Sequence, residues 1–547
     1  MARRGGYTRG MTLDRQSCYR AMTSHDARFD GRFFIGVRTT GIYCRPVCRV
    51  RLPRLENVVF YPCAAAAEQA GFRACRRCRP ETAPGSAAWQ GTSATVARAM
   101  RLIDAGALDG ASVGDLAGRL GVSERHLRRL FEQHLGAAPN QIALTRRLHL
   151  ARRLLDDTDL SIAAIALAAG FGSIRRFNAA MQASFGDAPS HLRRIALPKR
   201  ARSAAALRGR APRGGEAAAT AFAQVAAPTS TLVTLRLGYR PPMDWPWMLS
   251  FLGARAIAGV ESVQSGTYRR TVRAGDVVGS IEIGCDEERR ELVATLAIQD
   301  PAALAVISRR LARSFDCHAD PDVIASVLGR DPHLRSRIQQ RPGLRAPVTW
   351  EPFEAAVRAV VGQQISVAAA RTILARLAQR FGTRIEREGI DSACVFPTAE
   401  QLAEADLDDI GMPRARIETL KALARAVVSG QLPLDDTSDP HHACEAMLRV
   451  RGIGQWTAGY VAMRGLGDPD AMPYGDLGLL RAMRKALPEM NAARLEAHSH
   501  AWRPWRAYAA IHLWSHDGCE LSTTADASNG RARRSRPGAR TRSRRAA

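Results

Sequence analysis

The sequence predicts a multidomain protein: a small α+β domain around four cysteines, an all-α domain, an α+β domain with a sheet, and an all-α helical bundle. The first observation is length, because 547 residues exceed the ~250 at which a single core stops growing. The second is two stretches, 196–228 and 526–547, that are too poor in large apolar residues to form a core. The third is that the remaining blocks differ in pattern, from clustered cysteines to helical periodicity and to apolar–polar alternation at 229–299.

These breaks, with a shorter one around Pro84 and Gly85, set the domain boundaries. The predicted segments are a cysteine-rich domain at 12–82, a helical domain at 86–195, a basic linker at 196–228, a sheet domain at 229–315, a helical bundle at 316–525 and a disordered Arg-rich tail at 526–547. No run approaches ~18 apolar residues and no apolar stretch follows the N-terminus, so we expect no membrane partner and a cytoplasmic, nucleoid-associated protein.

The charge is large and unevenly placed. The chain carries 79 Lys and Arg against 52 Asp and Glu, a formal net charge of +27. Residues 1–195 hold +15 of this charge and the linker and tail hold +12, whereas residues 229–525 are neutral overall. A positive charge of this size favours a polyanionic partner, most often nucleic acid. The alternative is the arginine bias of a GC-rich genome.

Four of the eleven cysteines form two short pairs. Cys44 and Cys48 are separated by three residues, Cys75 and Cys78 by two, and 26 residues lie between the pairs. This spacing is typical of a tetrahedral four-cysteine zinc site. Disulfides are disfavoured because nothing marks the chain as secreted, and the alternative is four reduced structural cysteines.

The residues around these cysteines, Asp30–Cys48 and Ala70–Pro80, closely resemble the N-terminal domain of the Ada DNA-repair proteins. The resemblance implies that Cys44, as the first zinc ligand, accepts a methyl group from a methylphosphotriester in DNA. Zinc keeps such a ligand as the nucleophilic thiolate. The resemblance also implies contacts to the DNA backbone from Thr40, Arg51 and Arg73. For either arginine, the alternative is a solvated surface charge.

Two helix-turn-helix patterns follow in tandem, at 113–131 and 162–177. Each has a glycine at the turn (Gly121, Gly170) and a serine that can cap the second helix (Ser123, Ser173). The pair resembles the AraC family of regulators, with an ordinary small helical domain as the alternative. Polar residues early in the second helices are the candidates for reading bases: Arg125, His126 and Arg129 in the first unit, and Ile174, Arg175 and Asn178 in the second.

In the neutral half, Gly452 and Gly454 lie between two helical segments, and Asp476 follows 22 residues after the second glycine. Glycines let a backbone approach a phosphate closely, and free N–H groups at the next helix start can hold it. This pairing marks the helix-hairpin-helix DNA glycosylases. The flanks at 353–367 and 502–514 resemble the AlkA-type 3-methyladenine glycosylases.

The resemblance spans about 229–522 and implies a TATA-binding-protein-like sheet domain followed by the glycosylase bundle. It implies that Asp476 stabilises the oxocarbenium-like sugar or activates water. It further implies an aromatic pocket of Trp456, Tyr460 and Trp514 for a flipped, cationic base, although core packing is the alternative for each ring. Gln364 occupies the wedge position, where some relatives have Leu.

Three absences narrow the expected chemistry. Trp456 stands where lyase-type relatives have a Schiff-base lysine, so we expect hydrolysis without strand cleavage. Cys519 is alone after Asp476, so no iron–sulfur cluster is expected. A Pro-Cys-His-Arg motif is missing, so direct reversal of O6-methylguanine is not expected.

The expected function is therefore a bifunctional alkylation-response protein. It would sense methylphosphotriesters, regulate promoters (which would add RNA polymerase as a partner) and excise alkylated purines such as 3-methyladenine. One alternative is a methylation-sensing transcription factor with an inactive C-terminal module. Another is a repair enzyme whose N-terminal half only recruits it to DNA.

Overall fold

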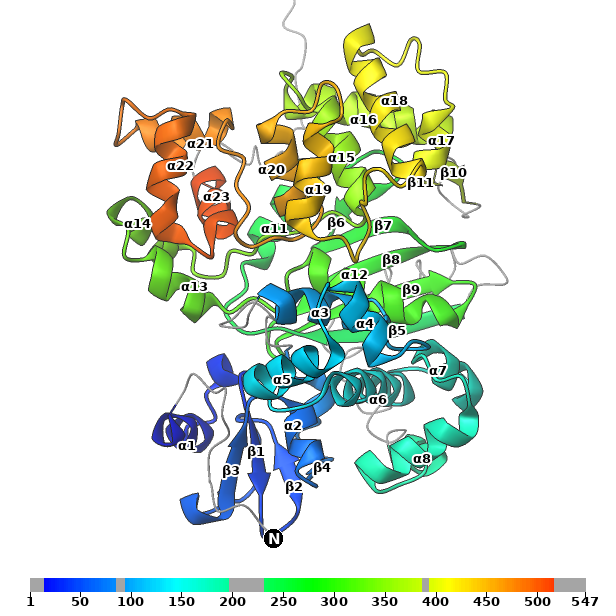
Figure 1. Cartoon of the computed structure of the whole chain (residues 1–547), viewed down its shortest axis with the longest axis vertical. Helices are drawn as coiled ribbons and strands as arrows, with labels where there is room; N and C mark the ends of the chain where they lie inside the picture. The colour runs from blue at the N-terminus through cyan, green and yellow to red at the C-terminus, as the bar shows by residue number, and fades with distance from the viewer. Residues whose placement is uncertain (1–13, 85–93, 196–230, 386–392, 516–547) are drawn as a thin grey trace, which may run out of the picture.

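A computed structural model describes residues 14–84, 94–195, 231–385 and 393–515 (Figure 1). The predicted linker and tail, and Cys519, lie outside these ranges. From bottom to top, Figure 1 shows the cysteine-rich domain, the helix-turn-helix domain, the sheet and the helical bundle. The multidomain fold class expected from the sequence is confirmed.

The cysteine-rich domain is a four-stranded sheet of order β3-β1-β2-β4 with small helices around it. Strands β2 and β4 are parallel neighbours, with Tyr43 opposite Ala74. Because Cys44 and Cys75 follow these two residues directly, this pairing joins the two cysteine pairs. The main elements are α1 (Arg15–Thr23), β1 (Phe34–Val37), β2 (Ile42–Cys44), β3 (Val58–Tyr61), α2 (Ala64–Gln69), β4 (Arg73–Ala74) and the 3₁₀ helix η3 (Pro80–Thr82).

The helix-turn-helix domain has the predicted tandem units, joined by the long helix α6. Gly121 and Gly170 have φ of 69° and 80°, so the left-handed turns use residues without a Cβ. The Ser123 and Ser173 side chains accept backbone N–H groups at the starts of α5 and α8, as predicted. The helices are α3 (Ala94–Asp104), α4 (Val113–Arg119), α5 (Glu124–Leu135), α6 (Pro139–Asp157), α7 (Ile162–Ala168) and α8 (Ile174–Phe185).

The sheet domain contains five antiparallel strands in the order β5-β9-β8-β7-β6. Apolar and polar residues alternate along β5, so that Val233, Leu235 and Leu237 are buried on one face of the sheet. Helices α11 and α12 pack beside the sheet. The elements are β5 (Thr231–Gly238), α11 (Trp245–Gly253), β6 (Glu261–Gln264), β7 (Thr267–Ala274), β8 (Val277–Asp286), β9 (Glu291–Ile298), η4 (Pro301–Ala303) and α12 (Leu304–Ser314).

The helical bundle has two apolar clusters, and helix α20 lies between them. Ala458 and Val461 belong to one cluster, and Ala462 and Met463 belong to the other. The elements are α13 (Pro321–Leu328), α14 (Pro332–Gln340), α15 (Pro352–Val361), α16 (Val367–Phe381), β10 (Thr383–Arg384), β11 (Cys394–Val395), α17 (Ala399–Ala403), α18 (Arg414–Val428), α19 (Pro440–Leu448), α20 (Gln455–Arg464), α21 (Leu477–Arg484), α22 (Ala492–Ser499) and α23 (Arg506–Trp514).

The N-terminal domains are packed against the sheet domain. Helix α6 contacts β5, and α7 contacts η4, so that one apolar cluster runs through all three domains. Arg240 is fully buried at this junction and donates hydrogen bonds to the carbonyl oxygens of Asp30 (2.9 Å) and His318 (2.8 Å). The two halves of the chain are therefore held together by an extensive buried contact. Among the described residues, no helix is long and apolar enough to cross a membrane.

Candidate active site and metal centre

Asp476 lies at the start of α21, and its carboxylate is held by three N–H donors. Oδ1 accepts the backbone N–H of Leu479 (3.0 Å) and the indole N–H of Trp514 (2.9 Å), while Oδ2 accepts the indole N–H of Trp456 (3.1 Å). The cap fixes the carboxylate on the backbone, and the two indoles fix its orientation. The sequence places these three side chains on different elements, and the fold brings them together.

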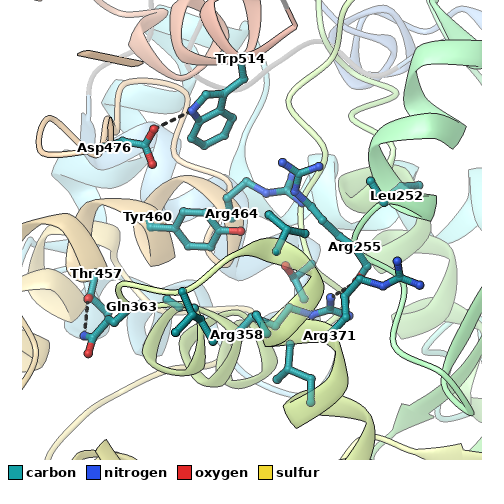
Figure 2. A pocket seen from close by; sticks show the side chains of 18 of the residues that line it. Leu252, Arg255, Arg358, Gln363, Arg371, Thr457, Tyr460, Arg464, Asp476 and Trp514 are labelled. Atoms are coloured by element: carbon teal, nitrogen blue, oxygen red, sulfur yellow. Dashed lines mark hydrogen bonds between the residues drawn. The ribbon is translucent and has the colours of Figure 1, made fainter. Parts of the chain in front are cut away.

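Trp456, Tyr460 and Trp514 form one aromatic group, as predicted. The Trp456 and Tyr460 rings stack at 5.5 Å between centroids, and the Tyr460 and Trp514 centroids are 6.4 Å apart. All three rings are half-buried and line a cavity of about 1340 Å³ that Asp476 also lines (Figure 2). The cavity is large enough to admit a purine base, and both aromatic and charged side chains line it.

The hairpin between α19 and α20 borders the same cavity. Gly452 has φ of 89°, and a Cβ there would lie 2.1 Å from Thr419 Oγ1. Gly454 precedes α20 in extended conformation, and no side chain of the described residues caps this helix. A Cβ on Gly454 would meet nothing within 4 Å. The hairpin thus leaves backbone N–H groups at the start of α20 open for an anion.

Gln364 lies in the loop between α15 and α16, where it is exposed and has φ of 56°. Its neighbour Gln363, which sequence reasoning missed, donates to the Gly452 carbonyl oxygen (3.2 Å) and to Thr457 Oγ1 (3.0 Å). Gln363 therefore ties the loop to the hairpin, while Gln364 is exposed and lines the cavity. No feature of the sequence separates the roles of two adjacent glutamines.

A charged wall on the far side of the cavity was also missed. Arg358 forms ion pairs with Glu261 and Glu354, both at 2.6 Å, and Arg270 pairs with Glu354 at 2.8 Å. This group is buried, and each charge has an opposite partner. Burial acts to raise the pKa of Glu261, but Arg358 and Arg270 lower it to about 2.

Arg464 lies on the same side, and its guanidinium is near the Tyr460 ring in Figure 2. The sequence did contain a signal for it, because positions 456, 460 and 464 are one helical turn apart. Trp456, Tyr460 and Arg464 accordingly line the same cavity from α20.

The four predicted metal ligands meet at one point. The Sγ atoms of Cys44, Cys48, Cys75 and Cys78 all lie within 4.8 Å of one another. A tetrahedral zinc with Zn–S bonds of about 2.3 Å needs sulfurs roughly 3.8 Å apart, so the four fit that ion. Cys44 is 7% exposed. The Arg45 backbone N–H donates to Cys78 Sγ at 3.4 Å. Hydrogen bonds of this kind support a metal ligand from outside the coordination sphere.

A buried polar network links the strand carrying Cys44 to helix α6. Tyr43 donates its hydroxyl to Glu68 Oε1 (2.8 Å), and Thr145 of α6 donates to Glu68 Oε2 (2.5 Å). His149 of the same helix lies 3.6 Å from Glu68. Burial acts to raise the pKa of Glu68, but His149, Thr145 and Tyr43 hold it below its usual value. The cysteine-rich domain is thereby fixed to the helix that joins the two helix-turn-helix units.

The predicted DNA-contacting side chains lie on the surface, apart from the cavity. Thr40, Arg51 and Arg73 are exposed on the cysteine-rich domain. In the helix-turn-helix units, Arg125, Arg129, Ile174, Arg175 and Asn178 are exposed and His126 is half-buried. Arg129 lies 3.1 Å from the His126 ring.

Sequence families match along most of the chain. The family described as "Metal binding domain of Ada" matches residues 17–81, a "Helix-turn-helix domain" family 116–195, the "AlkA N-terminal domain" 234–351, and the "HhH-GPD superfamily base excision DNA repair protein" family 357–507. These four matches follow the order of the four domains.

Curated relatives and solved structures cover the same parts. A probable bifunctional transcriptional activator/DNA repair enzyme AlkA of Mycobacterium tuberculosis is 42% identical over 505 residues, 92% of this chain and 96% of the relative. The DNA-3-methyladenine glycosylase 2 of Escherichia coli is 36% identical over 285 residues, 52% of this chain and 97% of the relative. A 3-methyladenine DNA-glycosylase structure from Archaeoglobus fulgidus covers 52% of this chain and 97% of its own, with 22% identity and a TM-score of 0.47.

Proposed function

Because the chain belongs to the family of bifunctional transcriptional activator/DNA repair enzymes, we propose that its C-terminal half hydrolyses the N-glycosidic bond of alkylated purines such as 3-methyladenine. The observation that carries this proposal is the Asp476 carboxylate held by the Trp456 and Trp514 indoles inside an aromatic cavity beside the hairpin. The similarity to the Escherichia coli glycosylase supports the substrate class.

The proposed reaction follows from this geometry. The hairpin holds a DNA phosphate with backbone N–H groups, and the damaged nucleotide turns out of the stack into the cavity. Gln364 enters the space that the base leaves. As the C1′–N bond breaks, positive charge builds on the sugar, and Asp476 stabilises it or activates the attacking water. Trp456 stands in place of a Schiff-base lysine, so the product is an abasic site without strand cleavage.

Replacement of Asp476 by Asn tests the assignment of the carboxylate. Asn keeps the cap on α21 but removes the negative charge, so the fold persists. We expect release of 3-methyladenine from methylated duplex to fall by about 10²–10⁴-fold. Release by Asp476→Asn at the wild-type rate would contradict the assignment.

For the N-terminal half, we propose that Cys44 accepts a methyl group from a methylphosphotriester. The family match at 17–81 and the four clustered sulfurs support zinc at Cys44, Cys48, Cys75 and Cys78. When bound, zinc keeps the ligands as thiolates. The Cys44 sulfur attacks the methyl carbon, the carbon–oxygen bond breaks, and the phosphodiester leaves with its negative charge. Thr40, Arg51 and Arg73 hold the backbone during transfer.

Transfer to Cys44 predicts a mass gain of one methyl group. After incubation with methylated duplex, mass spectrometry of peptides should locate it on Cys44 and on none of Cys48, Cys75 and Cys78. A methyl group on another of the four sulfurs, or on none, would overturn the choice of acceptor.

The tandem helix-turn-helix units support promoter binding, with Arg125, His126, Arg129 and Arg175 reading bases and RNA polymerase as a further partner. Methylation removes one negative charge from the cysteine site, which raises affinity for DNA phosphates. Footprinting of candidate promoters with methylated and unmethylated protein tests this role. Equal protection by both forms would leave only recruitment to DNA for the N-terminal half.

A further inference from the structure

The candidate active site contains a cation that the proposed mechanism does not use. Arg464 ends α20, one helical turn after Tyr460, and is only 5% exposed. Its Nε and Nη1 have no hydrogen-bond partner among the described residues. The guanidinium interacts with the Tyr460 hydroxyl and lies 4.8 Å from the Phe251 ring centroid. These two nitrogens are buried as well as unpaired among the described residues, and the Arg464 side chain lines the cavity.

Among the residues that the structure describes, the nearby acids do not neutralise the charge of Arg464. Glu261 and Glu354 are bound by Arg270 and Arg358, so the buried carboxylates of this wall are already paired. Burial, with the charges of Arg255 and Arg358, lowers the pKa of Arg464 to about 10, which still leaves it protonated at neutral pH. A buried cation without a counter-charge is costly unless a ligand supplies acceptors.

The cavity is thus polarised. The Asp476 carboxylate is held by the indole N–H groups at one end of the aromatic group, and the Arg464 guanidinium lies beyond Tyr460 on another side (Figure 2). Breaking the glycosidic bond separates charge between sugar and base. A carboxylate favours the positive sugar, whereas a guanidinium favours electron density that collects on the base.

Two classes of damaged base respond differently to such a cation. When a neutral purine leaves, the bonding electron pair goes to its ring nitrogen, and the base departs as an anion that later takes up the proton of the attacking water. When an N-alkylated cationic purine leaves, the same electron pair cancels its charge, and the base departs neutral. Arg464 stabilises the first leaving group and repels the second base before the bond breaks.

We propose that Arg464 is a specificity-determining residue that extends the reaction to neutral bases carrying a carbonyl oxygen, at the cost of weaker binding of cationic bases. This inference rests on the proposed glycosylase function. The positive guanidinium at the cavity wall attracts the carbonyl oxygen of the neutral base and the electron density that develops on its ring. For a cationic base, the repulsion disappears as the bond breaks, so kcat and KM change together.

The test measures excision of two bases from otherwise identical duplexes, one containing hypoxanthine (neutral, with a carbonyl) and one containing 3-methyladenine (cationic, without a carbonyl). Arg464→Met removes the charge at similar length. For hypoxanthine we expect kcat/KM to fall about tenfold or more. For 3-methyladenine we expect KM and kcat to fall together, with kcat/KM within about threefold of wild type.

Two further variants separate charge from packing. Arg464→Lys keeps the charge and should retain the wild-type ratio of the two kcat/KM values, and Arg464→Gln serves as the neutral variant if Arg464→Met does not fold. Arg371 is the matched control, because it lines the same cavity but is exposed, and its Nε donates to the Ala256 carbonyl oxygen at 3.0 Å. Arg371→Met should shift both substrates alike.

Equal losses on both bases in the neutral variants would overturn the role of Arg464. The same holds if Arg464→Lys behaves like the neutral variants. Wild-type protein that releases neither base would instead contradict the proposed glycosylase function, so the two failures are distinguishable.

Discussion

At the scale of single residues, the candidate site depends on how one carboxylate is held. Two indole N–H groups and one backbone N–H donate to Asp476, so both oxygens point in fixed directions. An enzyme gains from such preorganisation, because the carboxylate does not have to reorient as charge develops on the sugar. In the proposed mechanism, the two tryptophans are therefore positioning residues as well as pocket walls.

Trp514→Phe tests this positioning. The ring remains, but the hydrogen bond to Asp476 Oδ1 is lost, and we expect the single-turnover excision rate to fall about tenfold with little change in abasic-DNA affinity. Trp245→Phe is the control, because its indole N–H donates instead to the Gly266 carbonyl oxygen at 3.1 Å. A rate loss of equal size in the control would assign the effect to packing.

At the scale of elements, the hairpin between α19 and α20 contains two glycines, and a different physical reason accounts for each. Gly452 is required by the backbone, with φ of 89° and Thr419 against it, whereas Gly454 has open space around its Cα. Packing therefore does not require Gly454, and in the proposed function its bare Cα lets the DNA backbone approach.

The two glycines predict opposite phenotypes. Gly452→Ala should destabilise the protein by about 1–3 kcal/mol, because a Cβ is strained there and clashes with Thr419. Gly454→Ala should leave the melting temperature unchanged but weaken binding of a duplex with an abasic-site analogue. Thermal melting and DNA titration of both variants check this. Normal DNA affinity of Gly454→Ala would remove its proposed role.

The sequence predicted the elements that have local signals. The caps at Ser123 and Ser173, the glycine turns and the alternation of β5 are all confirmed, because each depends on neighbouring residues. The cysteine spacing likewise predicted the four-sulfur cluster. The Glu261 group was missed, because its partners come from elements as far apart as β6 and α15, and only tertiary packing brings them together.

At the scale of the whole molecule, acidic side chains just before α19 join it to other domains. Asp436 forms ion pairs with Arg310 (2.7 Å) and Arg313 (2.6 Å) of α12. Asp439, the cap of α19, lies 3.1 Å from Arg98 of α3. The hairpin is therefore tied both to the sheet domain and to the helix-turn-helix domain.

Asp436→Asn should destabilise the protein by roughly 3 kcal/mol, because it leaves two largely buried arginines without their shared partner. Burial acts to raise the pKa of Asp436, but Arg313 and Arg310 hold it below its usual value. The stabilisation is thus present above the unfolded pKa of about 3.9 and lost as pH falls through the lower folded pKa.

Denaturant unfolding of wild type and Asp436→Asn between pH 3 and 7 checks this, since their difference should shrink at acid pH. Asp439→Asn is the matched control, because Asn also caps a helix. The ion pair that it removes is more exposed, so the free energy of unfolding should fall by only about 0.5–1 kcal/mol. A difference that does not depend on pH would contradict the assigned role of Asp436.

The apolar cluster that runs from the cysteine-rich domain into the sheet has a consequence for how this chain can evolve. Residues of α6 face β5, and α7 lies against η4, so the regulatory half supplies part of the interior of the other half. A gene split within the linker would produce a C-terminal protein with uncovered apolar surface. A substitution in α6 must therefore remain compatible both with the helix-turn-helix domain and with the sheet domain. Separating the two halves into independent proteins would consequently require many compensating changes.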